Sequence, residues 1–262
     1  MLELPDARIA YDTVGSGPLI VFLHGVGSNR QTWQPQLREF SATHTAVAID
    51  ARGYGGSSTA PNTVSMARFA ADTAAVIKAV GHGSAHVCGL SMGGIVALHL
   101  WRDHPHLVLS LLLADSWAWH PSAAAGQDGR LAAIDASEMA SLARVRMPAV
   151  YGPGADPQLV RLGVERFASL DKSVYRAATA ELWGVDMRGV ARTVTVPTLV
   201  LVGEHDSIAP PQLSRELAGL ISGAQLVVIP AAGHLTNEEN PAAFNQAVGG
   251  FLRAWSERTM HG

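Results

Sequence analysis

The chain has 262 residues, of which 48% are hydrophobic, enough to bury a core in one domain with an insertion or in two small domains. Its 19 basic and 22 acidic residues give a net charge of −3, which argues against a nucleic-acid partner. The single cysteine excludes an internal disulfide, and neither a signal peptide nor an apolar run of membrane-spanning length follows Met1, so we expect a cytoplasmic protein without a membrane partner.

The first third of the chain alternates between short apolar runs and helical patterns. Two short strands are expected near Leu2–Leu4 and Arg8–Thr13, with a turn between them. Leu19–Leu23 is continuously apolar, as is typical of a strand buried on both faces of a parallel sheet. Helical spacing follows over residues 31–40 and 65–80, with a further strand over 45–49 between them.

The strand over residues 19–23 runs into His24-Gly25-Val26-Gly27. Hydrolases place half of an oxyanion hole in such a loop, as the backbone N–H of the residue after the first glycine, which is Val26 here. The second N–H would come from Met92. We interpret His24 as a buried residue that braces the loop rather than a proton-transfer group, and keep it as a candidate to line the substrate pocket.

The central motif is Gly89-Leu90-Ser91-Met92-Gly93, which lies between a strand-like run and a helical run. In that context G-x-S-x-G predicts a nucleophile elbow, a sharp turn that presents the serine hydroxyl at the end of the sheet. The turn forces the serine backbone into a strained conformation, and the two glycines avoid side-chain collisions because they lack a Cβ. A glycine-rich turn alone is weak evidence, so the prediction depends on an acid and a histidine further along the chain.

The composition changes after Asp115. Residues 117–190 contain no strand-like run, but several short helical patches, at 130–139, 156–167 and 171–182. We predict a helical cap of residues 117–190 inserted into a core formed by residues 1–116 and 191–262. Among the aromatic residues of the cap, Trp117 and Trp183 are candidates to line the substrate pocket.

The required acid and histidine follow in the resumed core. Asp206 and His234 each come just after a strand-like run, so Ser91, Asp206 and His234 have the order Ser, Asp, His. The carboxyl ends of parallel strands share one edge of a sheet, and the three side chains can therefore converge. Asp115 also follows a strand and is the alternative acid.

Taken together, these motifs resemble the α/β-hydrolase fold family over nearly the whole chain. The matching segments are His24-Gly25, Asp50-x-Arg52-Gly53-x-Gly55-x-Ser57, Gly89-x-Ser91-Met92-Gly93-Gly94, Gly203-x-x-Asp206 and Gly233-His234. Within the family the chain is most similar to the 3-oxoadipate enol-lactonases and related small capped carboxylesterases. The resemblance implies an α/β-hydrolase fold with a mostly parallel eight-stranded sheet, flanking helices and an inserted helical cap.

The chemistry of these residues predicts a serine hydrolase that cleaves a small carboxylic ester or enol-lactone through an acyl-enzyme. His234 would take the proton of Ser91, and Asp206 would hold the imidazole in the right tautomer. The histidines lack the spacing of zinc sites, so no metal and no cofactor is expected, and the partner is a small-molecule substrate.

Three other functions stay open. A C–C bond hydrolase for meta-cleavage products and a cofactor-free perhydrolase share the fold and the triad, and a hydrolase-fold ligand receptor would bind without efficient turnover. Because the charges of the cap nearly cancel, we expect a small, mainly apolar substrate held by Trp117 and Trp183. A carboxylate-bearing substrate would require a cap arginine that is turned inward and free of an acidic partner.

Overall fold

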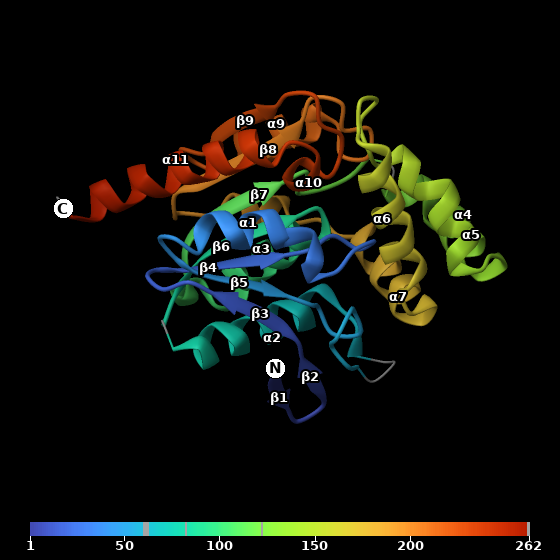
Figure 1. Ribbon diagram of the computed structural model, residues 1–262, viewed down its shortest axis with the longest axis horizontal. Coiled ribbons are helices and arrows are strands. Elements are labelled where there is room, and N and C mark those ends of the chain that lie inside the picture. The colour runs from blue at the N-terminus through green and yellow to red at the C-terminus, as the bar shows by residue number, and fades with distance from the viewer. Residues whose placement is uncertain (60–62, 82, 122, 261–262) are drawn as a thin grey trace.

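The computed structural model describes residues 1–59, 63–81, 83–121 and 123–260 of the chain, built around one large sheet (Figure 1). The order of its strands is β3-β5-β4-β6-β7-β8-β9; β3 is antiparallel to β5 and all other neighbours are parallel. The strands of the sheet are β3 (Tyr11–Val14), β4 (Leu19–Leu23), β5 (Thr45–Ile49), β6 (Ala85–Leu90), β7 (Val108–Ala114), β8 (Thr198–Gly203) and β9 (Gln225–Ile229).

The expectation of eight strands in this sheet is wrong for the described chain, where the sheet has seven. The first two strands, β1 (Leu2–Leu4) and β2 (Ala7–Ile9), pair with each other in a separate antiparallel hairpin around a turn at Pro5-Asp6. The run expected as one strand over 8–13 is interrupted at Ala10, and only its second part, β3, joins the sheet. β3 pairs with one neighbour only and forms an edge of the sheet.

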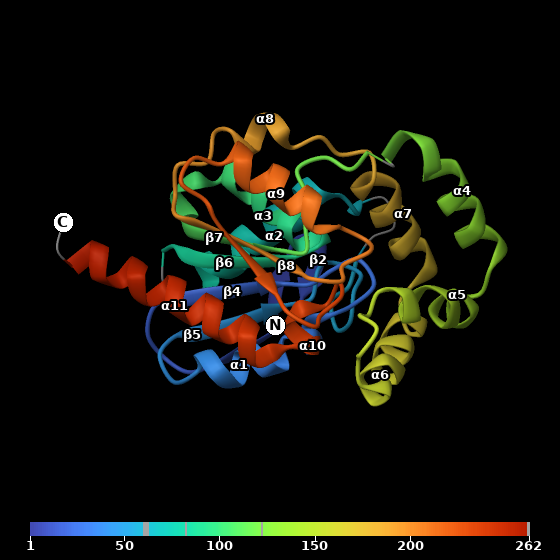
Figure 2. The same cartoon turned by 90° about the horizontal axis from the view of Figure 1, so that it is seen from above.

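Helices cover both faces of the sheet. Figure 2 shows α2, α3 and α9 on one face, with α1 and α11 on the other. Their bounds are α1 (Gln34–Phe40), α2 (Met66–Val80), α3 (Met92–Asp103), α9 (Pro211–Leu220), α10 (Thr236–Glu239) and α11 (Pro241–Met260). Five of the seven strands, β4 to β8 in chain order, have almost no residue open to solvent, which explains their mainly apolar sequences.

A helical insertion, which we define as residues 117–190, separates β7 from β8 and lies beyond one end of the sheet in both views (Figures 1 and 2). Its helices are α4 (Ala123–Ala136), α5 (Met139–Arg146), α6 (Pro157–Ala168) and α7 (Lys172–Leu182), with the start of α8 (Arg188–Ala191) at its end. Asp156 and Asp171 cap α6 and α7 by accepting hydrogen bonds from backbone N–H groups of the first turn. The helix expected over 130–139 instead ends at Ala136, and α5 follows as a separate helix.

Cys88 lies in β6, two residues before its end, and is fully buried. Burial raises the pKa of its thiol well above the ordinary value, because the apolar surroundings disfavour the thiolate. In the described part of the chain, no helix combines the length and apolar character that crossing a membrane requires.

Candidate active site

Ser91 occupies the turn between β6 and α3. Its backbone has φ 55 and ψ −115, a left-handed conformation that non-glycine residues rarely adopt. Crowding around the turn accounts for the flanking glycines: a Cβ on Gly89 would lie 2.1 Å from the carbonyl oxygen of Gly93, and one on Gly93 would lie 2.2 Å from that of Leu23. The strand–turn–helix predicted for the G-x-S-x-G motif is therefore present, and its glycines are needed for the reason that the sequence suggests.

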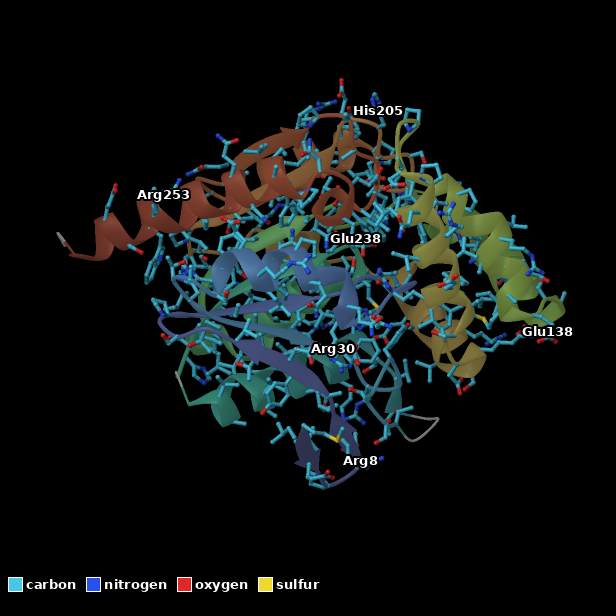
Figure 3. All side chains as sticks on the ribbon, in the orientation of Figure 1. Arg8, Arg30, Glu138, His205, Glu238 and Arg253 are labelled. Carbon is cyan, nitrogen blue, oxygen red and sulfur yellow. The ribbon has the colours of Figure 1, made fainter. Side chains whose placement is uncertain are left out.

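His234 and Asp206 are joined by a hydrogen bond of 2.8 Å between Nδ1 of the imidazole and Oδ2 of the carboxylate. Asp206 is almost completely buried, and its second oxygen accepts the backbone N–H groups of Ile208 and Ala209, each at 2.8 Å. The carboxylate is thereby fixed in orientation. The neighbouring Glu204 and His205 have exposed side chains, and Figure 3 shows His205 at the outer surface.

Asp115, the alternative acid, is completely buried but bonded elsewhere. It accepts the backbone N–H of Gly203 at 2.9 Å and the hydroxyl of Thr236 at 2.5 Å. Burial and the nearby charge of Asp206 raise the pKa of its carboxyl well above the ordinary range. Asp115 thus links the ends of the two loops that carry Asp206 and His234.

The loop at Val26 approaches the serine closely. A Cβ on Gly25 would lie only 3.4 Å from the Cβ of Ser91, and Val26 lines the same cavity as Ser91. Met92 is the first residue of α3, where backbone N–H groups have no acceptor within the helix and favour negative charge. Both residues predicted to donate to an oxyanion are therefore close to Ser91: Met92 follows it in the chain, and Val26 lines the same cavity.

His24 is the exception among the predicted pocket residues. Its Nδ1 is 2.8 Å from the carbonyl oxygen of Gly25, and its Nε2 accepts the backbone N–H of Ala51 at 3.1 Å. Burial lowers the pKa of the ring, which stays neutral and holds two loops together. His24 lies behind the cavity that contains Ser91 rather than on its wall, so its candidacy for the substrate pocket is a wrong prediction.

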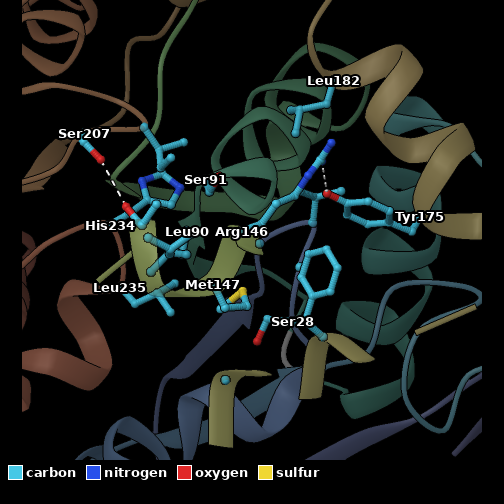
Figure 4. Close-up of a pocket in the computed structure, with 18 of the residues that line it drawn as sticks. Ser28, Leu90, Ser91, Arg146, Met147, Tyr175, Leu182, Ser207, His234 and Leu235 are labelled. Atoms are coloured by element: carbon cyan, nitrogen blue, oxygen red, sulfur yellow. Dashed lines mark hydrogen bonds between the residues drawn. The ribbon is translucent and has the colours of Figure 1, made fainter. Parts of the chain in front are cut away.

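A cavity of about 530 Å³ is lined by Ser91, His234 and other core residues together with residues of the helical insertion. Figure 4 shows Ser91 and His234 at one side of this cavity, with Tyr175 on the opposite side. Trp117 and Trp183, the two tryptophans named as pocket candidates, both line this cavity, and their stacked rings have centroids 5.3 Å apart. Its size and mostly apolar lining suit a small organic molecule.

Three arginines of the insertion line the cavity, and among the described lining residues there is no carboxylate. Arg166 is neutralised by Glu238 at 2.8 Å and also donates to the hydroxyl of Ser28 at 3.2 Å. The guanidinium of Arg130 lies 3.9 Å from the ring centroid of Trp183, and burial followed by the nearby charge of Arg146 lowers the pKa of Arg130.

Arg146 differs from these two. It donates a hydrogen bond of 2.8 Å to the phenol oxygen of Tyr175, which is a neutral acceptor. Figure 4 shows its side chain crossing the cavity toward Tyr175. Within the described chain no carboxylate lies at ion-pair distance from Arg146, so its charge is available to a bound anion.

The chain matches the model of the Alpha/beta hydrolase family over residues 20–247. It belongs to the alpha/beta hydrolase family. It is 28% identical over 244 residues to 3-oxoadipate enol-lactonase 1 of Acinetobacter baylyi, covering 91% of this chain and 90% of that protein. It is 27% identical to 2-(acetamidomethylene)succinate hydrolase of Mesorhizobium japonicum, covering 92% and 90%. The crystal structure of the enol-lactonase from Burkholderia xenovorans LB400 is similar, with a TM-score of 0.87, 27% identity, and coverage of 94% and 97%.

These similarities confirm the expected fold class and the resemblance to enol-lactonases. In this alpha/beta hydrolase the motif residues stand where the sequence places them, because each follows a strand that ends at the same edge of the sheet. Arg130, Arg146 and Arg166 were missed as cavity residues. Nothing in the sequence distinguishes them from the exposed arginines of the insertion, since helix faces decide which side chains turn inward.

Proposed function

We propose that this alpha/beta hydrolase cleaves small carboxylic esters or lactones through an acyl-enzyme on Ser91. The observation that carries the proposal is the hydrogen bond of 2.8 Å between Asp206 and His234, whose side chain lines the same cavity as Ser91. His234 would take the proton of Ser91 as the hydroxyl attacks the carbonyl carbon, and Asp206 would stabilise the imidazolium. The backbone N–H groups of Val26 and Met92 would bind the oxyanion, each donor being worth about 3 kcal/mol in the barrier.

The acyl-enzyme would then be hydrolysed by water, with His234 again acting as the base. One experiment tests this reaction: purified protein is offered an aryl ester, an enol-lactone and a vinylogous diketone, with and without peroxide. Hydrolysis of the ester and the lactone supports the proposal. Turnover of the diketone alone would favour C–C bond cleavage, a peracid product would favour a perhydrolase, and binding without turnover would favour a receptor.

The pH dependence of the reaction follows from the surroundings of His234. Burial lowers the pKa of the imidazole, but the charges of Asp206, Asp115 and Glu239 outweigh burial and raise the pKa above its ordinary value of 6.5. A general base must be neutral, so kcat/KM falls as the pH drops through this raised pKa. We expect the acidic limb of a pH profile measured from roughly pH 5 to 9 to have its midpoint above 6.5. A midpoint below that value would contradict this account of the site.

We further propose that the preferred substrate carries a carboxylate. Such a substrate requires an arginine that points into the cavity and has no acidic partner. Arg146 lines the cavity and donates to the neutral Tyr175. This proposal replaces the expectation of a mainly apolar substrate, which depended on the overall charge of the insertion and not on its inner face. The names of the two relatives support it, because 3-oxoadipate and succinate are both dicarboxylates.

Replacing the arginine tests the carboxylate directly. Charge-assisted hydrogen bonds are worth about 1.5–3 kcal/mol, so Arg146→Gln should lower kcat/KM for a carboxylate-bearing ester by about 10- to 100-fold. The matched neutral ester should change by less than about twofold, because it makes no charged contact. Arg144 is exposed on the same helix, and Arg144→Gln serves as the control that affects neither substrate. Equal losses for both esters would contradict the proposal.

A further inference from the structure

The helical insertion contacts the loop of His234 through a short main-chain segment, residues 149–152, which lies between α5 and α6. The carbonyl oxygen of Val150 accepts the backbone N–H of His234 at 2.8 Å. The preceding carbonyl, that of Ala149, accepts the hydroxyl of Ser207, the residue after Asp206, at 3.1 Å. The 149–152 segment is therefore bonded to the loops of both the proposed base and the proposed acid.

Glu239, the last residue of α10, binds the same two stretches of chain from the other side. One of its carboxylate oxygens accepts the N–H of Gly152 at 2.7 Å. The other accepts the N–H groups of Gly233 at 3.0 Å and Leu235 at 3.2 Å. The backbone N–H groups of three consecutive residues, 233–235, are thus all hydrogen-bonded. Glu239 accepts the first and the third, and the carbonyl oxygen of Val150 accepts that of His234.

The two stretches also fit closely. A Cβ on Gly152 would lie 2.9 Å from the backbone nitrogen of Gly233 and 3.1 Å from a carboxylate oxygen of Glu239. Conversely, a Cβ on Gly233 would lie 2.4 Å from the nitrogen of Gly152. No side chain can enter this contact without moving one main chain against the other. A Cβ on Gly154, two residues further along the insertion, would meet nothing within 4 Å.

The 149–152 segment also contacts α6 of the insertion. The hydroxyl of Tyr151 donates to the carbonyl oxygen of Leu159 in α6 at 3.3 Å, and its ring packs where Gly163 leaves room. Arg166, also in α6, forms the ion pair with Glu238, the neighbour of Glu239; its nitrogen lies 2.8 Å from the carboxylate. The position of α6 and the position of the His234 loop therefore depend on each other.

We infer that Glu239 is a positioning residue that, together with the 149–152 segment, fixes the main chain of His234. The insertion therefore takes part in aligning the base as well as in lining the pocket. The inference rests on the proposed function of His234. Displacing a catalytic group by about 1 Å can cost about 100-fold in rate. A residue that aligns the base should therefore affect kcat much more than substrate binding.

The experiment compares Glu239→Gln and Gly152→Ala with Gly154→Ala and the wild type. Each protein is assayed for kcat and KM with an aryl ester, for the rate of inactivation by a fluorophosphonate, and for its Tm. We expect Glu239→Gln and Gly152→Ala to lower kcat and the inactivation rate by about 10- to 100-fold, with KM changed less than about twofold. Gly154→Ala should match the wild type. Glu239→Gln should also shift the midpoint of the acidic limb to lower pH, because a carboxylate near His234 is lost.

The outcomes separate the inference from the proposed function. A wild-type protein that neither hydrolyses esters nor reacts with the fluorophosphonate would refute the proposed function itself. An active wild type whose Glu239→Gln variant loses Tm but keeps kcat and pH profile would overturn the inference alone, because Glu239 would then be purely structural. The inference is likewise overturned if Gly152→Ala and Gly154→Ala behave alike. Should Glu239→Gln fail to fold, the two glycine variants decide.

Discussion

Replacing Ser91 by alanine should lower kcat for ester hydrolysis by roughly 10⁶, the loss expected when a covalent nucleophile is removed from a triad. The physical reason is that water would have to attack the substrate directly, with only binding and the oxyanion donors left to lower the barrier. The serine stands in a strained turn at the start of α3, where the helix terminus favours the developing negative charge. The measurement is steady-state hydrolysis of an aryl ester, with circular dichroism to verify folding.

Covalent labelling gives an independent readout of the same residue. A fluorophosphonate should add once to the wild-type protein, and peptide mapping should place the adduct on Ser91. Ser28 also lines the cavity, so Ser28→Ala is a matched variant that removes a hydroxyl and should still be labelled. Labelling that persists in Ser91→Ala would place the nucleophile elsewhere and refute the proposed mechanism.

The second large effect is expected at Asp206. Asp206→Asn should lower kcat by about 10⁴, because an amide stabilises the wrong tautomer of His234 and does not stabilise the imidazolium. The structure supplies the reason for choosing this residue: its Oδ2 lies 2.8 Å from Nδ1 of His234. The assay is again ester hydrolysis, with KM expected to change little.

Asp115→Asn is the control for this assignment, since Asp115 also follows a strand and is buried nearby. Its hydrogen bonds go to Gly203 and Thr236, and an asparagine keeps one oxygen acceptor for them. Losing a single hydrogen bond is worth about 1 kcal/mol, so we expect a reduction in kcat of no more than about tenfold. If Asp115→Asn proves more damaging than Asp206→Asn while the protein stays folded, Asp115 is the acid.

The local structures that could be predicted are those determined by residues close together in the sequence. The turn at Ser91 is specified by Gly89 and Gly93, and the starts of α6 and α7 by the capping side chains of Asp156 and Asp171. The convergence of the proposed triad residues could also be predicted, because parallel strands bring the loops that follow them to one edge of the sheet. These features need no knowledge of how distant helices pack.

Features that depend on long-range packing could not be predicted. Which arginine of the insertion turns inward is decided by how α4 to α7 are set against the core, and the local sequence around Arg146 resembles that around the exposed Arg144. His24 begins a loop of the site, but its Nε2 accepts the backbone N–H of Ala51 and its ring does not line the cavity. The role of Glu239 could not be predicted either, because it depends on a hydrogen bond from Gly152, a residue of the insertion 87 positions away in the chain.

The burial of Cys88 makes this chain a convenient host for chemical probes. Its thiol is the only one in the sequence and lies buried in a central strand, where the raised pKa keeps it protonated. We therefore expect maleimides to leave the thiol of the native protein unmodified. A cysteine introduced by Val145→Cys would therefore be the sole attachment point for a dye. Val145 is 77% exposed and lies at the rim of the cavity. A dye placed there could report ligand entry optically, without any background from the rest of the molecule.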